Sequence, residues 1–313
     1  MQGTKAGFNN SDSYFKYNVK KSEFSVNYDF SYRAVDKRSY ESLGTYHLPT
    51  GETLHRNYLG YDSPFLYTLN EVQLGYNLSE PDKYTLNVRF GFFNLNAPVR
   101  GTNQLYQESG KADQYLQNNI KDLEQTPSVD IYYSLNMPHE QNLALNVVGT
   151  YIGTDHSYRM REYAFNQSPE ESMKGEPLSD YSYDATGRKR SLIGEGIYTK
   201  NWKKISLSAG GQYNISHTDN VYVGSSNADT ELKYSNLYLF TQMQGQVKWF
   251  GYQVGVGATR SSIHQGENGY SKWLFRPQVT LNAKVNDHLS FRWSSKITSD
   301  IPSLSDLSEL RQY

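Results

Sequence analysis

Apolar and polar residues alternate along much of the chain with a period of two. Segment 24–33 reads FSVNYDFSYR, with an aromatic residue or valine at every second position. Because successive side chains of a strand point to opposite faces, this pattern is typical of a strand with one apolar environment. It recurs in segments 72–78, 84–92, 143–151, 205–215, 247–249, 252–258, 279–285 and 289–293. The pattern predicts about twelve strands of about ten residues each.

The connections between these strands alternate between short and long. The short ones, rich in turn-forming residues, lie at 20–23, 79–83, 136–142, 200–204, 250–251 and 286–288. The long ones lie at roughly 35–64, 96–127, 153–190, 218–235 and 262–272. In the first of these, residues 48–52 predict a turn between strands 40–47 and 53–61. Segment 110–123 has a brief helical spacing and predicts a short loop helix.

Strand length and loop asymmetry together predict an all-β fold, a partial antiparallel transmembrane β-barrel of about twelve strands. Short turns would then be periplasmic and long loops extracellular, with apolar faces on lipid and polar faces on the lumen. A soluble sandwich, in which two apolar faces pack together, also explains the alternation. The interpretation therefore depends on which environment the apolar face meets.

Aromatic residues near the strand ends favour lipid, because amphipathic rings prefer the membrane interface. Some lie beside the short turns and others toward the long connections, although aromatics can also cap an ordinary sheet. The predicted belt consists, on the short-turn side, of Trp202, Trp249 and Tyr252 and, toward the long connections, of Tyr32, Phe92, Tyr151 and Trp293.

Composition restricts the classes of function. The 313 residues include 28 Tyr and 13 Phe but are only 37% hydrophobic, and no apolar run reaches the roughly 18 residues of a membrane helix. A formal net charge of -1 gives no support for a nucleic-acid partner. The start of the chain shows no secretory signal, so we expect 1–313 to be a single partial barrel domain from a longer protein of the outer membrane.

Chemistry at a reactive centre has little support in the sequence. There is no Cys, the His residues lack metal-ligand spacing, and no nucleophile elbow occurs. Asp180, Asp184, Asp219 and Asp229 could at most bind calcium singly. We therefore expect no enzyme activity, no metal site and no cofactor.

The long connections contain tyrosines interleaved with arginines. Aromatic rings stack on sugar faces or flat chelates, while guanidinium groups bond hydroxyl or carboxylate groups. The same rings could instead pack the loops against one another. The candidate ligand-binding residues are Tyr106, Tyr115, Tyr158, Arg159, Arg161, Tyr163, Tyr181, Tyr183 and Arg188.

The last hundred residues resemble the barrel of Bacteroidetes-type TonB-dependent outer-membrane receptors. Segment 275–293 is similar to that family's paired strands around an Asn-Asp turn, and segment 301–307 is similar to the Pro-Ser-x-x-x-Leu stretch that follows. The family commonly has Arg before that Pro, where this chain has Ile301.

The resemblance implies nutrient import, of a glycan, chelate or peptide, through a 22-stranded barrel with a plug domain that couples to the TonB complex. A surface lipoprotein is a further possible partner, besides outer-membrane lipid. No plug or TonB-box segment is recognisable in these residues. Two alternatives stay open: an outer-membrane barrel without TonB coupling, porin-like or adhesin-like, and a secreted all-β carbohydrate-binding protein.

Overall fold

The computed structural model describes residues 6–285 and 288–298, which are almost entirely strand. The elements are β1 (Ala6–Val19), β2 (Ser22–Val35), β3 (Tyr40–His47), β4 (Thr53–Tyr61), β5 (Phe65–Glu80), β6 (Tyr84–Glu108), β7 (Gln114–Met137), β8 (Gln141–Ala164), α1 (Pro169–Ser172), β9 (Ser179–Trp202), β10 (Ile205–Gly224), β11 (Ala228–Val247), β12 (Phe250–Gln265), β13 (Asn268–Lys284) and β14 (Ser290–Lys296).

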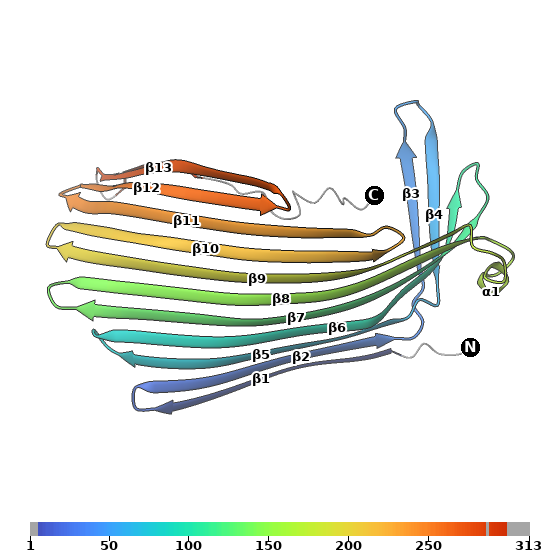
Figure 1. The fold of residues 1–313 in the computed structure, drawn as a ribbon, viewed down its shortest axis with the longest axis horizontal. Helices are drawn as coiled ribbons and strands as arrows, with labels where there is room; N and C mark the ends of the chain where they lie inside the picture. The colour runs from blue at the N-terminus through green and yellow to red at the C-terminus, as the bar shows by residue number, and fades with distance from the viewer. Residues whose placement is uncertain (1–5, 286–287, 299–313) are drawn as a thin grey trace.

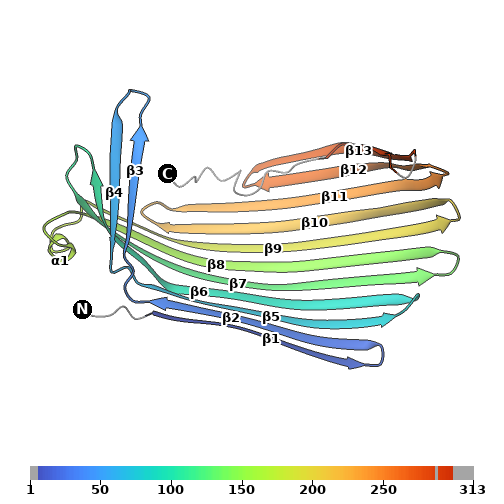
Figure 2. The same cartoon turned by 180° about the vertical axis from the view of Figure 1, so that it is seen from behind.

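The strands form one antiparallel sheet in which nearly every strand pairs with its neighbours in sequence. The path runs β1-β2-β5-β6-β7-β8-β9-β10-β11-β12-β13-β14, which confirms twelve strands along the main path. β3 and β4 form the predicted hairpin, and β4 pairs with the end of β6. Figures 1 and 2 show this hairpin and α1 at one end of the long strands, with the short turns at the other. Among the described residues, β1 and β14 each pair on one side only, so the sheet is open.

One face of the sheet, here called the apolar face, exposes large hydrophobic side chains near the short turns. Antiparallel partners share a face, and the row Val129, Gly149, Leu192, Ile215 follows from the register of β7 to β10. Leu192 is 48% exposed. In the described part of the chain, the buried hydrophobic residues are only Ala97, Leu105, Tyr115 and Tyr163. A single sheet whose apolar face is exposed, with so few buried hydrophobic residues, excludes the two-sheet sandwich.

The exposed apolar residues nearest the short turns form a continuous band of limited width, here called the apolar band. On β10 it extends from Ile205 to Ile215, and the next residue on that face is His217. The band thus spans about eleven residues, within the roughly 9–11 of a tilted membrane strand. The predicted strand length of about ten therefore describes the band, while the strands themselves continue further.

The predicted long connections are mostly continued strand, so the strands are longer than the about ten residues predicted. β6, with 25 residues, and β7 to β9, with 24 residues each, extend far beyond the apolar band. Both faces of these extensions carry polar residues, so alternation disappears, yet the backbone groups still need partners and the ladder continues. We call β3, β4 and residues 100–108, 114–122, 156–164 and 179–185 the distal sheet.

The short turns lie where the sequence predicts them, with one shift. The turn predicted at 250–251 lies at Lys248 and Trp249, directly before β12. Lys248 has φ 54°, and Asp82 in another turn has φ 64°. The turn predicted at 286–288 includes residues outside the described part of the chain, as does segment 301–307.

The helix predicted in 110–123 is absent, because residues from Gln114 onward belong to β7. Tyr115 lies on the apolar-face side, whereas Leu116 and Ile120 lie on the opposite side, so their spacing does not define one helical face. A single helical turn, α1, occurs later. Ser168 caps it by accepting a hydrogen bond from the Glu171 backbone N–H at 3.2 Å.

Candidate functional site

Three predicted tyrosines gather on the polar face of the distal sheet. Tyr158 on β8 lies directly opposite Tyr183 on β9, and Tyr181 is two residues away on the same face. The ring centroids of Tyr158 and Tyr183 are 5.4 Å apart, those of Tyr181 and Tyr183 5.9 Å, and those of Tyr158 and Tyr181 6.3 Å. Burial raises the pKa of Tyr158 above its ordinary value. The three rings form a continuous aromatic surface.

His156, which is not among the candidates predicted from the sequence, joins this cluster. His156 Nδ1 lies 2.5 Å from Asp122 Oδ1, and the Tyr183 hydroxyl lies 3.4 Å from His156 Nε2. The other Asp122 oxygen accepts a hydrogen bond from Arg100 Nη1 at 2.7 Å. His156 precedes Tyr158 by two positions, so a strand places both on one face. The cluster therefore combines stacking surface with hydrogen-bonding groups, and we call these four aromatic residues, with Asp122 and Arg100, the polar-face cluster.

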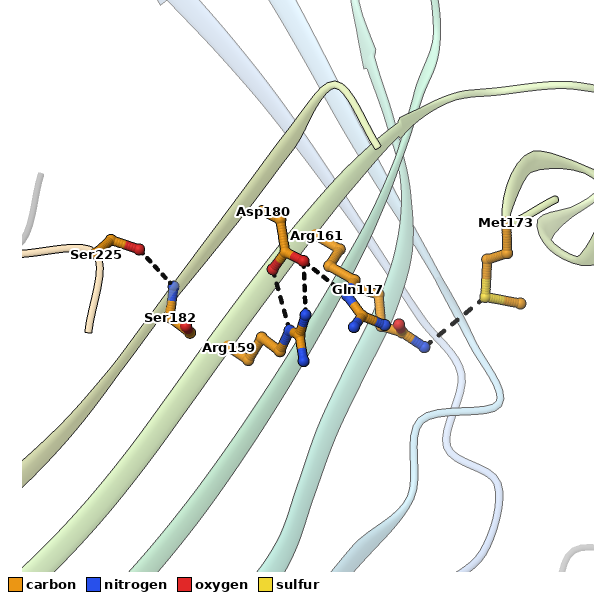
Figure 3. Close-up of polar contacts among 7 residues, drawn as sticks. All are labelled: Gln117, Arg159, Arg161, Met173, Asp180, Ser182 and Ser225. Atoms are coloured by element: carbon orange, nitrogen blue, oxygen red, sulfur yellow. Dashed lines mark hydrogen bonds and ion pairs between the residues drawn. The ribbon is translucent and has the colours of Figure 1, made fainter. Parts of the chain in front are cut away.

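Two of the predicted arginines lie on the opposite face and are engaged there. Figure 3 shows Arg159 and Arg161 converging on Asp180. Arg159 donates to both Asp180 oxygens, from Nε at 3.0 Å and from Nη2 at 2.6 Å, while Arg161 Nε lies 3.3 Å from Oδ2. Arg159 holds the pKa of Asp180 below its usual value. These arginines cannot contact the same ligand face as Tyr158.

Tyr115 and Tyr163 are buried and belong to the small core of the distal sheet. They are 2% and 6% exposed, face each other across β7 and β8, and have ring centroids 6.4 Å apart. Burial raises the pKa of Tyr115 to about 12. Nearby, Gln117 Nε2 lies 3.8 Å from Met173 Sδ, which ties the segment after α1 to β7 (Figure 3). Both tyrosines therefore have the packing role rather than a ligand-binding one.

The remaining two candidates are also committed to internal contacts. Tyr106 packs on Tyr58 with ring centroids 5.1 Å apart, and its hydroxyl donates to Glu108. Burial, with this hydrogen bond, raises the pKa of Tyr106 to about 12. Arg188 donates to Asp155 Oδ1 at 2.9 Å. Neither residue contributes a free group to the polar-face cluster.

The predicted belt residues within strands all lie on the apolar face. The register places Trp202, Ile205, Gly245, Tyr252, Leu281 and Trp293 in one row beside the short turns. Trp293 was predicted on the long-connection side, and this was wrong. Trp293 on β14 lies opposite Leu281 on β13, which in turn lies opposite Tyr252 beside a short turn. Tyr32, Phe92 and Tyr151 lie further along the strands, and Trp249 lies in a turn.

One group of side chains could hold a metal ion, in contrast to the expectation of none. His217 and Asp219 on β10 and Glu231 on β11 place one ligand atom each within 4.8 Å of one another. They lie on the apolar-face side, directly beyond the apolar band. The candidate calcium residue Asp219 thus belongs to a group, whereas Asp180 is held by arginines.

Comparison with known proteins gives no family assignment. No helix in the described residues is long and apolar enough to cross a membrane. No family model matches the chain, and no curated protein is similar to it in sequence.

Two solved structures of outer-membrane proteins are weakly similar. The outer membrane protease OmpT from Escherichia coli is 9% identical, with 86% of this chain and 96% of that chain covered and a TM-score of 0.24. The ferric citrate transporter FecA, in its unliganded form, is 7% identical, with 90% of this chain and 55% of that chain covered and a TM-score of 0.35. The chain thus spans just over half the length of that transporter.

Proposed function

We propose that the chain is a lipid-facing β-barrel segment of an outer-membrane protein. The observation that carries this proposal is the apolar band, which is about as wide as a bilayer's hydrocarbon core requires and lies on one face of a single sheet. In water, such a band would be a large exposed hydrophobic surface, which soluble monomers avoid. The row containing Trp202, Tyr252 and Trp293 marks its periplasmic edge.

Cell fractionation tests this location. The protein should be recovered with the outer membrane, resist extraction by high salt and carbonate, and require detergent for release. Recovery in the aqueous fraction without detergent would overturn the proposal.

For the activity, the function supported best is selective import of a nutrient as part of a TonB-dependent receptor. The polar-face cluster supports ligand capture, because Tyr158, Tyr181 and Tyr183 offer ring faces to a sugar or a flat chelate, and His156 offers a polar group beside them. The proposal involves no covalent step. Coupling to TonB requires a plug domain, as the sequence resemblance implies.

Uptake assays can test ligand capture with a control on the same strand. The Tyr158→Ala, Tyr183→Ala double variant should lower uptake of labelled oligosaccharides or ferric chelates into cells. Arg159→Ala changes the neighbouring residue on the opposite face and should leave uptake unchanged. Equal uptake by the double variant and the wild type would remove the ligand role from the cluster.

The TonB step is tested separately. Uptake through the wild-type protein should stop when the inner-membrane TonB complex is disrupted. Uptake that continues in that strain would favour the alternative of a porin-like barrel without TonB coupling.

A further inference from the structure

Sheet pairing assembles three metal-ligating side chains that are dispersed in the sequence. His217 and Asp219 are two residues apart on β10 and therefore share a face. Glu231 on β11 lies directly opposite Asp219. This face is also the one that exposes Ile215, so the three side chains lie on the outside of the sheet, His217 in the first row beyond the apolar band and Asp219 with Glu231 in the next.

The ligand atoms of this trio converge at close range. His217 Nε2 lies 2.9 Å from Asp219 Oδ1 and 3.0 Å from Glu231 Oε1. Nevertheless, Nε2 is covered from solvent and makes no hydrogen bond of acceptable geometry within the described chain. One imidazole nitrogen and two carboxylate oxygens gathered in this way form a set of ligand atoms that a divalent cation can join.

We propose that His217, Asp219 and Glu231 bind a divalent transition-metal ion of the zinc class. In a tetrahedral zinc site, with bonds of about 2.0–2.1 Å, adjacent ligand atoms lie roughly 3.3 Å apart. His217 Nε2 needs to move away from each of the two carboxylate oxygens by only a few tenths of an ångström to admit the ion. Three protein ligands leave a fourth position for water, as in open zinc sites. An imidazole ligand favours Zn²⁺ over Mg²⁺ or Ca²⁺, which prefer oxygen ligands alone.

A neighbouring lysine competes for the same carboxylate. Lys233 Nζ lies 2.6 Å from Glu231 Oε1. Lys233 is opposite His217, and its ammonium group would have to move aside for the metal. The two remaining charged neighbours across β9 are Arg190 and Arg188, of which Arg188 is bonded to Asp155.

Isothermal titration of the detergent-purified protein with ZnCl₂ tests the site. We expect one Zn²⁺ per chain, and His217→Gln should weaken binding at least about tenfold, or 1.4 kcal/mol. Asp219→Asn should weaken it similarly. Lys233→Gln should strengthen it, because the competing ammonium is removed. His264→Gln is the matched control, since His264 lies opposite Lys233 on β12 in the same row and bonds to Ser262 at 3.1 Å.

Circular dichroism and heat-dependent migration on gels establish that each variant is folded before titration. Zinc binding that is unchanged in both His217→Gln and Asp219→Asn would overturn the proposal. So would the absence of Zn²⁺ binding to the wild type, or equally tight binding of Mg²⁺. The result does not depend on ligand uptake, so the metal site and the proposed import function can fail independently.

Discussion

The apolar band and the distal sheet are two parts of the same strands, yet they are stabilised in opposite ways. In the band, hydrophobic side chains point outward and are exposed in the isolated chain, as Leu239 is at 49%. In the distal sheet, hydrophobic residues point toward a small buried core around Tyr115 and Tyr163. In the proposed membrane location the band has lipid as its partner, whereas the distal sheet has water outside and packing inside. Substitutions should therefore have different effects in the two regions.

The largest effect on stability should come from a substitution in the small buried core of the distal sheet. We expect Tyr115→Ala to destabilise the distal sheet by about 3–5 kcal/mol, because a buried aromatic ring is lost and a cavity remains. The effect should be local, since regions of low stability open separately from the rest of a protein. Hydrogen exchange measured by mass spectrometry should show faster exchange in 100–122 and 156–164. Unchanged exchange there would show that the region has another source of stability.

The next largest effect should come from placing a charge in the band. Val147→Arg on β8 should lower the free energy of unfolding in lipid vesicles by about 2–4 kcal/mol, the cost of Arg near the bilayer midplane. Ser157→Arg lies on the same face of the same strand, beyond the band, and should have almost no effect. Denaturant titration followed by tryptophan fluorescence measures both. Equal effects of the two variants would contradict the proposed membrane boundary.

Acid should affect the distal sheet more than the band, through Glu108. Its carboxylate contacts Lys111, Tyr106 and Arg56, and these contacts lower its pKa from 4.5 to about 2. A carboxylate with a lowered pKa stabilises the fold above its unfolded pKa, and this contribution is lost as the pH falls toward about 2. Pepsin digestion between these pH values should cleave the distal sheet progressively. In Glu108→Gln, cleavage should depend less on pH over this interval.

The smallest effect on stability should come from a substitution in a short turn next to the band. Lys248 adopts φ 54°, a left-handed conformation that costs a non-glycine residue about 1 kcal/mol. Lys248→Gly should therefore raise the free energy of unfolding by up to about that amount. Denaturant titration in the same vesicles measures it, with Lys203→Gly in the preceding short turn, which has no positive φ, as the control. A loss of stability in Lys248→Gly would show that its side chain has a role.

The band could be predicted from sequence and the distal sheet could not, for one physical reason. One apolar and one polar face force alternation, as the proposed lipid and water environments would require, so the strands containing Phe24 and Leu207 are evident. Beyond the band both faces are polar, and only backbone pairing maintains the strand. The β3–β4 hairpin is the exception, because residues 48–52 include the turn residue Gly51, with φ 88°.

The candidate site was predicted in part, for a related reason. The tyrosines at 158, 181 and 183 were identified by type, and the sheet brings them together. Arg159 is separated from them although it is adjacent in sequence, because a strand sends neighbouring residues to opposite faces. The partnership of His156 with Asp122, and that of His217 with Glu231, depend on cross-strand register, which composition and spacing do not reveal.

The continuity of β8 and β9 from the band into the distal sheet constrains how the protein is assembled. If these strands enter the bilayer from the periplasm, the tip of their hairpin must reach the far side first. This tip contains Arg159, Arg161 and Asp180. Bringing one Arg to the centre of a bilayer costs about 2.5–3.5 kcal/mol even under favourable conditions. Transit of the charged tips is therefore expected to limit the rate of insertion, and neutralising Asp180 while keeping both arginines should slow it further.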